Sequence, residues 1–130
     1  MIQSVAGRQP TIVVIDDEPA IRNAMTRFFE RRGWRCIPIA DGAAAAVVLF
    51  SVDGMCEFDV VLCDLRLPHT SGLELFERAQ HERPDVAARF VLSSGDTNGL
   101  FVACPVLAKP FPLSEVAEMA DSILGRNRAA

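Results

Sequence analysis

The stretch FDVVLCDLRLP at residues 58–68 decides the fold. Its apolar, Val-rich run is typical of a strand buried on both faces, as in the interior of a parallel sheet. The run ends at Asp64. Because a carboxylate is costly to bury, we expect Asp64 at the mouth of the sheet, where open α/β folds bind ligands. Pro68 follows shortly after and predicts a loop over that mouth.

Similar runs elsewhere in the chain alternate with helical patterns. Together with residues 58–64, the predicted strands are residues 11–15, 35–39, 89–94 and 105–108. Pro38 lies inside the second strand, which indicates an edge position because proline has no N–H to donate to the ladder. The alternation predicts an α/β fold with a doubly wound, five-stranded parallel sheet and helices on both faces.

Helices are expected between and after these strands. The first begins at Pro19, a residue suited to the first turn of a helix. Its apolar stripe consists of Ile21, Ala24, Met25 and Phe28. A later helix begins with the capping box S-G-L-E at residues 71–74, and its inner face consists of Leu73, Phe76 and Ala79 or Gln80. The last helix is expected to end at Gly125-Arg126.

Length and composition indicate one globular domain. The chain has 130 residues, half of them hydrophobic, which is enough to bury a core and argues against disorder. We place a leader at residues 1–10, the folded domain at residues 11–125 and a frayed tail at residues 126–130.

Charge and apolar patterning exclude several classes of function. A net charge of −4 argues against direct binding of nucleic acid or of anionic membranes. No apolar stretch is long enough to span a membrane, and the first residues are too polar for a signal peptide. The cysteines are scattered without a metal-binding pattern, which favours reduced thiols. We therefore expect a cytoplasmic protein without membrane insertion.

Polar side chains follow the predicted strands at their carboxyl ends. They are Asp16, Asp17, Asp64, Ser93, Ser94 and Lys109. In a parallel sheet these ends share one edge, so the side chains converge. Neighbouring carboxylates repel one another unless a cation neutralises them, and oxygen ligands favour Mg²⁺. A carboxylate nucleophile, a metal ion and a positioned lysine together predict an aspartyl-phosphate site.

Four short motifs in this order resemble the receiver domain of bacterial two-component response regulators. They are IDDEP at 15–19, LCDLRLP at 62–68 with SGLE at 71–74, LSSG at 92–95 and KPF at 109–111. The resemblance covers residues 11–125, and VLAKPF at 106–111 is similar to receivers attached to hybrid histidine kinases. It implies a flavodoxin-like sheet of order 2-1-3-4-5.

The resemblance implies a metal site and a phosphoacceptor. Asp64 would accept the phosphoryl group. Asp17 and Asp64 would bind Mg²⁺ directly, and the backbone carbonyl of Arg66 would add a third ligand. Asp16 would act through water.

The resemblance also implies a switch. Lys109 would bind the phosphoryl group, and Ser94 would be the switch hydroxyl because a small residue, Gly95, follows it. The phosphoryl donor would be a phosphohistidine on a histidine kinase or phosphotransfer protein. The receiving partner would be a downstream protein or the remainder of a hybrid kinase. The domain would phosphorylate and dephosphorylate itself without being a dedicated enzyme.

The chain departs from the family pattern in two ways. Val106 stands where receivers usually have an aromatic switch residue. Ser94 and Lys109 are only 15 positions apart (109 − 94), so the fourth helix should be short or absent. Arg66 and Asp96 flank the mouth, and they form either a shield over the acyl phosphate or a solvated surface ion pair.

Two other functions fit parts of the sequence. A phosphohydrolase of the haloacid dehalogenase type also uses an aspartate nucleophile with Mg²⁺, but it needs Asp-x-Asp, whereas Asp16 and Asp17 are adjacent. A degenerate receiver would instead be a docking module that never becomes phosphorylated. It predicts weak Mg²⁺ affinity and no response to phosphoryl donors.

Overall fold

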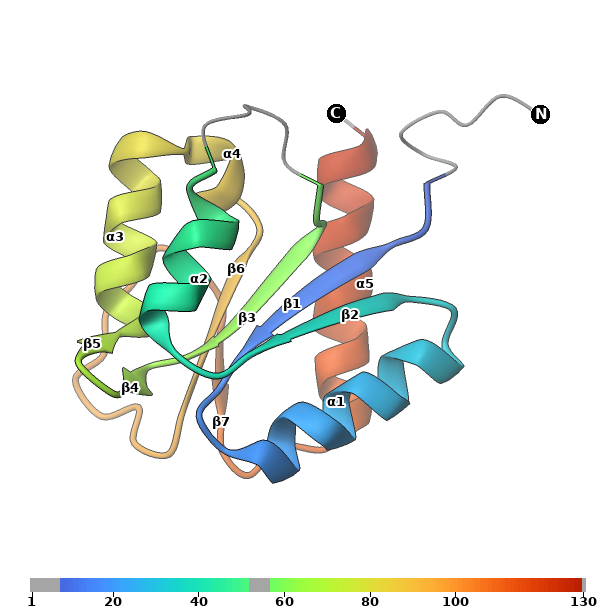
Figure 1. The fold of residues 1–130 in the computed structure, drawn as a ribbon, viewed down its shortest axis with the longest axis horizontal. Coiled ribbons are helices and arrows are strands. Elements are labelled where there is room, and N and C mark those ends of the chain that lie inside the picture. The colour runs from blue at the N-terminus through green and yellow to red at the C-terminus, as the bar shows by residue number, and fades with distance from the viewer. Residues whose placement is uncertain (1–7, 52–56, 130) are drawn as a thin grey trace.

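The computed structural model describes residues 8–51 and 57–129. Most of the expected leader, residues 1–7, and the final residue of the expected tail lie outside these ranges. The main sheet consists of β1 (Thr11–Ile15), β2 (Arg35–Ile39), β3 (Val60–Asp64), β6 (Phe90–Ser94) and β7 (Val106–Ala108). All its pairings are parallel, in the order β2-β1-β3-β6-β7, which is the predicted order 2-1-3-4-5 (Figure 1). β2, which contains Pro38, is an edge strand as predicted.

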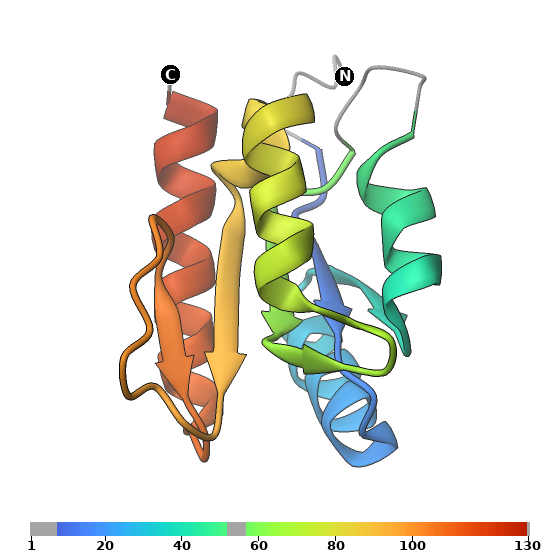
Figure 2. The same ribbon diagram turned by 90° about the vertical axis from the view of Figure 1, so that its left-hand side faces the viewer.

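Helices cover both faces of this sheet, as Figures 1 and 2 show. The helices are α1 (Pro19–Arg31), α2 (Gly42–Leu49), α3 (Gly72–Glu82), the short α4 (Pro84–Ala87) and α5 (Leu113–Ala129). One core cluster joins the sheet to α1 and α5, and the other joins it to α2, α3 and α4. In β1, Ile12 and Val14 belong to the first cluster and Val13 and Ile15 to the second, because successive strand residues face opposite sides.

α1 and α3 begin where the sequence predicts, but the buried face of each differs from the expectation, and the short α4 is not among the predicted helices. The Ser71 hydroxyl accepts a hydrogen bond from the Glu74 N–H at 3.1 Å, which caps α3. In α1, Phe29 is fully buried while Ala24 is exposed. In α3, Leu75 lies on the inner face instead of Leu73. The buried face of each helix therefore lies one to two residues along the sequence from the expected face.

The connection between β6 and β7 and the C-terminal end of α5 test the remaining predictions. Residues 95–105, all described, contain no helix, so the prediction that the fourth helix of a receiver is short or absent is confirmed. The expected helix end at Gly125-Arg126 is wrong, because α5 continues to Ala129.

A two-stranded hairpin after β3 has no counterpart in the sequence-based expectation. It pairs β4 (Arg66–Leu67) with β5 (Thr70–Ser71) in antiparallel register. His69 occupies its turn with a φ of 67°, in the left-handed region that is uncommon for residues other than glycine and in which asparagine, aspartate and histidine are enriched. The hairpin closes the loop that Pro68 predicted and leads directly into α3.

Across the described ranges, no helix combines the length and apolar character that crossing a bilayer requires.

Candidate functional site

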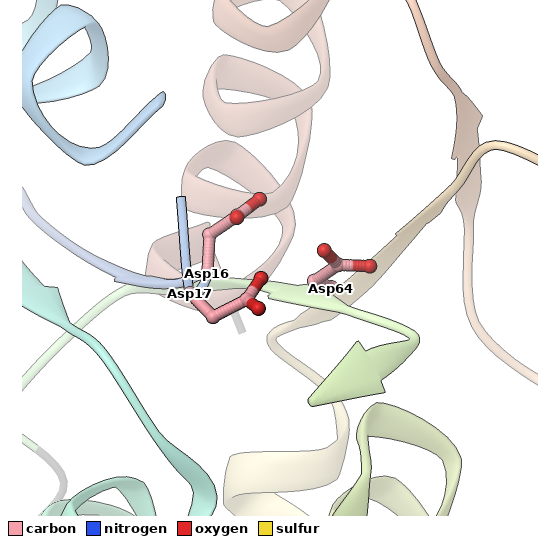
Figure 3. A group of neighbouring side chains, drawn as sticks. All are labelled: Asp16, Asp17 and Asp64. Atoms are coloured by element: carbon pink, nitrogen blue, oxygen red, sulfur yellow. The ribbon is translucent and has the colours of Figure 1, made fainter. Parts of the chain in front are cut away.

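The carboxyl ends of β1 and β3 bring three carboxylates together. β1 and β3 are paired in parallel with Ile15 opposite Cys63, so Asp16 and Asp17 come next to Asp64. Oxygen atoms of the three side chains lie within 4.8 Å of one another (Figure 3). Asp16 and Asp64 are buried, and Asp17 is exposed. The predicted convergence of the acidic residues is therefore present.

Lys109 provides the positive charge in this cluster. Its Nζ donates hydrogen bonds to Asp16 Oδ2 at 2.9 Å and to Asp64 Oδ2 at 3.0 Å, and Glu18 Oε1 is 3.9 Å away. Partial burial lowers the pKa of Lys109, but the hydrogen bonds and charges of Asp16 and Asp64 outweigh burial, and the net pKa is raised. A single ammonium group against several carboxylates leaves the cluster with a net negative charge.

Backbone N–H groups hold the two buried carboxylates. Arg66 donates its N–H to Asp64 Oδ1 at 3.1 Å, and Glu18 donates its N–H to Asp16 Oδ1 at 2.9 Å. Each carboxylate therefore has one oxygen fixed by the backbone and the other facing Lys109. The predicted contribution of the Arg66 carbonyl to a metal site stays a prediction.

Gly72 is a site residue that the sequence-based reasoning missed. A Cβ at this position would lie 2.5 Å from the Asp64 carbonyl oxygen and 2.9 Å from Leu92 Cδ2. The Gly72 N–H also donates to the Leu65 carbonyl at 2.8 Å. Only glycine lets α3 begin so close to the end of β3. The sequence placed Gly72 inside a capping box, which accounts for the helix start but not for the close approach.

Ser94 lies at the predicted strand end, but its hydroxyl is bonded to the following loop. Ser94 Oγ donates to the Asp96 carbonyl at 2.8 Å and accepts the Asp96 N–H at 3.1 Å. The Ser94 carbonyl accepts the Lys109 N–H at 2.8 Å, which links the switch candidate to the lysine. Among the described residues, no hydrogen bond joins the Ser94 hydroxyl to Asp64.

The expected pair between Arg66 and Asp96 is wrong. Both side chains are exposed, and no ion pair joins these two described residues. Asp96 Oδ1 instead accepts the Asn98 N–H at 3.0 Å, because the short β6–β7 connection folds back on itself. Val106 is half-buried and packs against the core cluster under α2 and α3, at the position where an aromatic switch would stand.

Comparison with known proteins assigns the family. The model of the response regulator receiver domain matches residues 12–121. The chain is a receiver domain. The transcriptional activator protein PfeR of Pseudomonas aeruginosa is 32% identical over 126 residues, which cover 92% of this chain and 39% of PfeR. The chain spans about half or less of the length of the curated relatives that it matches first.

Solved receiver structures agree with the fold. The receiver domain of the hybrid histidine kinase CckA is 25% identical with a TM-score of 0.71, over 88% of this chain and 98% of that one. The response regulator TrrA of Thermotoga maritima, solved in complex with Mg²⁺ and beryllofluoride, is 25% identical with a TM-score of 0.76, over 89% and 100% of the two chains. The predicted family and its likeness to hybrid-kinase receivers are thereby confirmed, and the haloacid dehalogenase alternative is set aside.

Proposed function

We propose that this receiver domain accepts a phosphoryl group on Asp64 from a phosphohistidine and signals through a change in conformation. The observation that carries the proposal is the position of Lys109, whose Nζ bridges Asp16 and Asp64 at 2.9 and 3.0 Å inside a net negative cluster. A carboxylate that serves only the fold would have its charge balanced by the protein. Asp64 shares one ammonium group with Asp16 and lies at a ligand-binding edge of the sheet.

The acidic cluster fits Mg²⁺. Its donors are all carboxylate oxygens, which is the ligand type of a hard divalent cation, and the neighbouring Lys109 leaves the net charge negative. Asp17 and Asp64 would bind the ion, with the Arg66 carbonyl as a further ligand and Asp16 acting through water. The Mg²⁺ and beryllofluoride complex of TrrA supports this assignment by analogy. When bound, Mg²⁺ supplies positive charge to the oxygens of the transferring phosphoryl group.

Asp64 performs the covalent step. A carboxylate oxygen of Asp64 attacks the phosphorus, the P–O bond forms, and the P–N bond of the phosphohistidine breaks with its electron pair going to the imidazole. Lys109 moves from Asp64 Oδ2 to a phosphoryl oxygen, and its raised pKa keeps it protonated for this purpose. The Arg66 N–H holds the other carboxylate oxygen and so fixes the direction of attack.

The donor is a histidine kinase or a phosphotransfer protein. A cavity of about 430 Å³ adjoins Lys109, with Ile21, Met25 and Phe111 in its wall. This apolar surface beside a charged site supports docking of a donor protein. The recipient of the signal is a downstream protein or the remainder of a hybrid kinase. We place the domain in the cytoplasm and assign it neither DNA binding nor a dedicated enzyme activity.

Ser94 carries the switch. To reach a phosphoryl group on Asp64, its hydroxyl must exchange both of its bonds with the Asp96 backbone for one with the phosphoryl oxygen. That exchange releases the turn after β6. Because the half-buried Val106 cannot act as an aromatic switch, the conformational change is carried by the loop at residues 95–105.

Intact-protein mass spectrometry tests the proposal. Wild-type protein is incubated with acetyl phosphate, with Mg²⁺ or with EDTA, beside the Asp64→Asn variant. We expect one phosphoryl adduct on the wild type with Mg²⁺ only, and none on the variant. No adduct on the wild type, together with no stabilisation by Mg²⁺, would contradict the proposal and favour the docking module.

A further inference from the structure

The turn from Asp16 to Glu18 sets the position of the exposed Asp17. The Asp16 N–H donates to the Ile39 carbonyl at 3.1 Å, and the Glu18 N–H donates to Asp16 Oδ1 at 2.9 Å. Within the described residues the Asp17 carboxylate accepts no hydrogen bond, so its direction depends on the backbone of the turn. A contact that fixes the backbone of residues 16–18 therefore also orients Asp17, a proposed metal ligand.

Arg22 adds a side-chain contact to the backbone of this turn. From the end of the first turn of α1, its NH1 group donates to the Asp16 carbonyl at 2.9 Å, and its backbone N–H donates to the Glu18 carbonyl at 3.2 Å. The side chain therefore connects the helix to the carbonyl that joins Asp16 to Asp17. Arg22 is half-buried, whereas Arg27, on the same helix, is exposed and has no polar contact within the described residues.

We infer that Arg22 is a positioning residue for the divalent-cation site, acting through the backbone of Asp16. The inference rests on the proposed function, since it concerns the same carboxylates. Two effects of Arg22 on a bound cation have opposite signs. Its positive charge opposes the cation, whereas its hydrogen bond holds the Asp16–Asp17 peptide in one orientation and lowers the cost of ordering Asp17 on binding.

The position of the hydrogen bond decides which effect is larger. The guanidinium contacts a backbone carbonyl and forms no ion pair with the carboxylates of Asp16, Asp17 or Asp64, all of them described residues. Water screens the repulsion between a partly solvated guanidinium group and a bound cation. It does not remove the hydrogen bond that holds the Asp16–Asp17 peptide in one orientation. Loss of Arg22 should therefore weaken cation binding, although it removes a positive charge.

Mg²⁺ titration by calorimetry separates the two effects. The proteins are wild type, Arg22→Met, Arg22→Lys and the matched control Arg27→Met, which removes the same charge from the same helix. We expect Arg22→Met to weaken Mg²⁺ binding roughly three- to tenfold, the effect of one lost hydrogen bond. Arg27→Met should leave Mg²⁺ binding unchanged or slightly tighter. Arg22→Lys should weaken Mg²⁺ binding less than Arg22→Met does, because lysine retains the positive charge but lacks the planar guanidinium group.

Phosphorylation by acetyl phosphate provides a second readout. In Arg22→Met the Mg²⁺ concentration at half-maximal rate should rise, while the rate at saturating Mg²⁺ stays near that of the wild type. Unchanged or tighter Mg²⁺ binding by Arg22→Met would overturn the inference. So would an equal weakening in Arg27→Met, which would point to a general disturbance of α1 and not to the contact between Arg22 and the Asp16 carbonyl.

Hydrogen exchange keeps the inference testable if wild-type protein binds no Mg²⁺, an outcome that would count against the proposed function instead. In metal-free protein we expect the Glu18 amide to exchange faster in Arg22→Met than in wild type or Arg27→Met, because the turn has lost its connection to α1. Equal exchange in all three proteins would show that Arg22 does not position the turn.

Discussion

The two ends of β3 carry two buried aspartates with very different partners. Asp59 precedes the strand, its side chain is 3% exposed, and its carboxylate accepts hydrogen bonds from the Thr11 N–H at 2.9 Å, from Arg8 at 3.1 Å and from Arg128 at 3.2 Å. Asp64 ends the strand and accepts hydrogen bonds from one backbone N–H and from Lys109, which also donates to Asp16. Two arginines therefore balance the charge of Asp59, whereas Asp64 has one lysine that it shares with a second carboxylate.

This difference shows that burial alone does not identify a functional carboxylate. Two guanidinium groups neutralise Asp59, one from the N-terminal segment and one from the end of α5. At the opposite edge, Asp64 and its acidic neighbours outnumber the positive charge of Lys109. The carboxyl end of β3, where carboxylates outnumber positive charges, is therefore the end suited to bind a cation and to accept a phosphoryl group.

Removing each aspartate should produce the largest contrast in stability. We expect Asp59→Ala to lower the free energy of unfolding by roughly 3–5 kcal/mol, because it leaves partly buried arginines without their carboxylate. Asp64→Ala should change it by no more than about 1 kcal/mol in EDTA, since Lys109 keeps Asp16 and a repulsive charge is lost. Urea denaturation at pH 7 measures both. Equal losses would mean that both aspartates serve the fold.

Gly72→Ala should disturb only the Asp64 end. The added Cβ would lie 2.5 Å from the Asp64 carbonyl, so we expect a loss of about 1–3 kcal/mol together with impaired phosphorylation. Gly125→Ala is the control, because a Cβ there meets nothing within 4 Å, and in mid-helix it should gain about 0.5–1 kcal/mol. Normal phosphorylation in Gly72→Ala would contradict the role given to the close approach.

Mg²⁺ should stabilise the protein only through the carboxylates at the Asp64 end of β3. At a Mg²⁺ concentration ten times the Kd, the folded state gains about 1.4 kcal/mol if the ion binds only the native protein. Thermal denaturation with and without Mg²⁺ should show this gain in wild type and in Asp59→Asn but not in Asp64→Asn. A gain that survives in Asp64→Asn would place the ion elsewhere.

The smallest expected effect concerns an exposed ion pair. Arg32, the residue that follows α1, forms an ion pair with Asp121 of α5 at 3.1 Å, but the two side chains are 40% and 53% exposed. Arg32→Ala should cost less than about 1 kcal/mol, because water screens such pairs. Arg128→Ala should cost more, since the Arg128 side chain is only 12% exposed and its partner is buried. Similar costs in urea denaturation would mean that burial does not set the strength of these pairs.

The sequence was most informative about the edge of the sheet that we propose to hold the phosphoacceptor. Asp16, Asp17, Asp64 and Lys109 each follow an apolar run, and parallel topology alone brings such positions to one edge. A short or absent fourth receiver helix could be predicted because it follows from the spacing between Ser94 and Lys109.

Features that depend on contacts between distant segments could not be predicted. The sequence indicated only that Asp59 lies in the predicted strand. Its ion pairs could not be predicted, because its partners Arg8 and Arg128 lie 51 and 69 positions away. The same contact explains why α5 continues past Gly125, where the residue type suggested an end. Gly72 and the hairpin turn at His69 likewise depend on how closely β3 and α3 approach.

Chemical mapping of the phosphorylated residue tests the central claim most directly. Borohydride reduces an aspartyl phosphate to homoserine, and a tryptic peptide of residues 36–66 contains both Asp59 and Asp64. After incubation with acetyl phosphate and Mg²⁺, fragmentation of this peptide should locate homoserine at position 64 and leave Asp59 intact. Homoserine at another position, or at both ends of β3, would contradict the account of Asp64 as the phosphoacceptor.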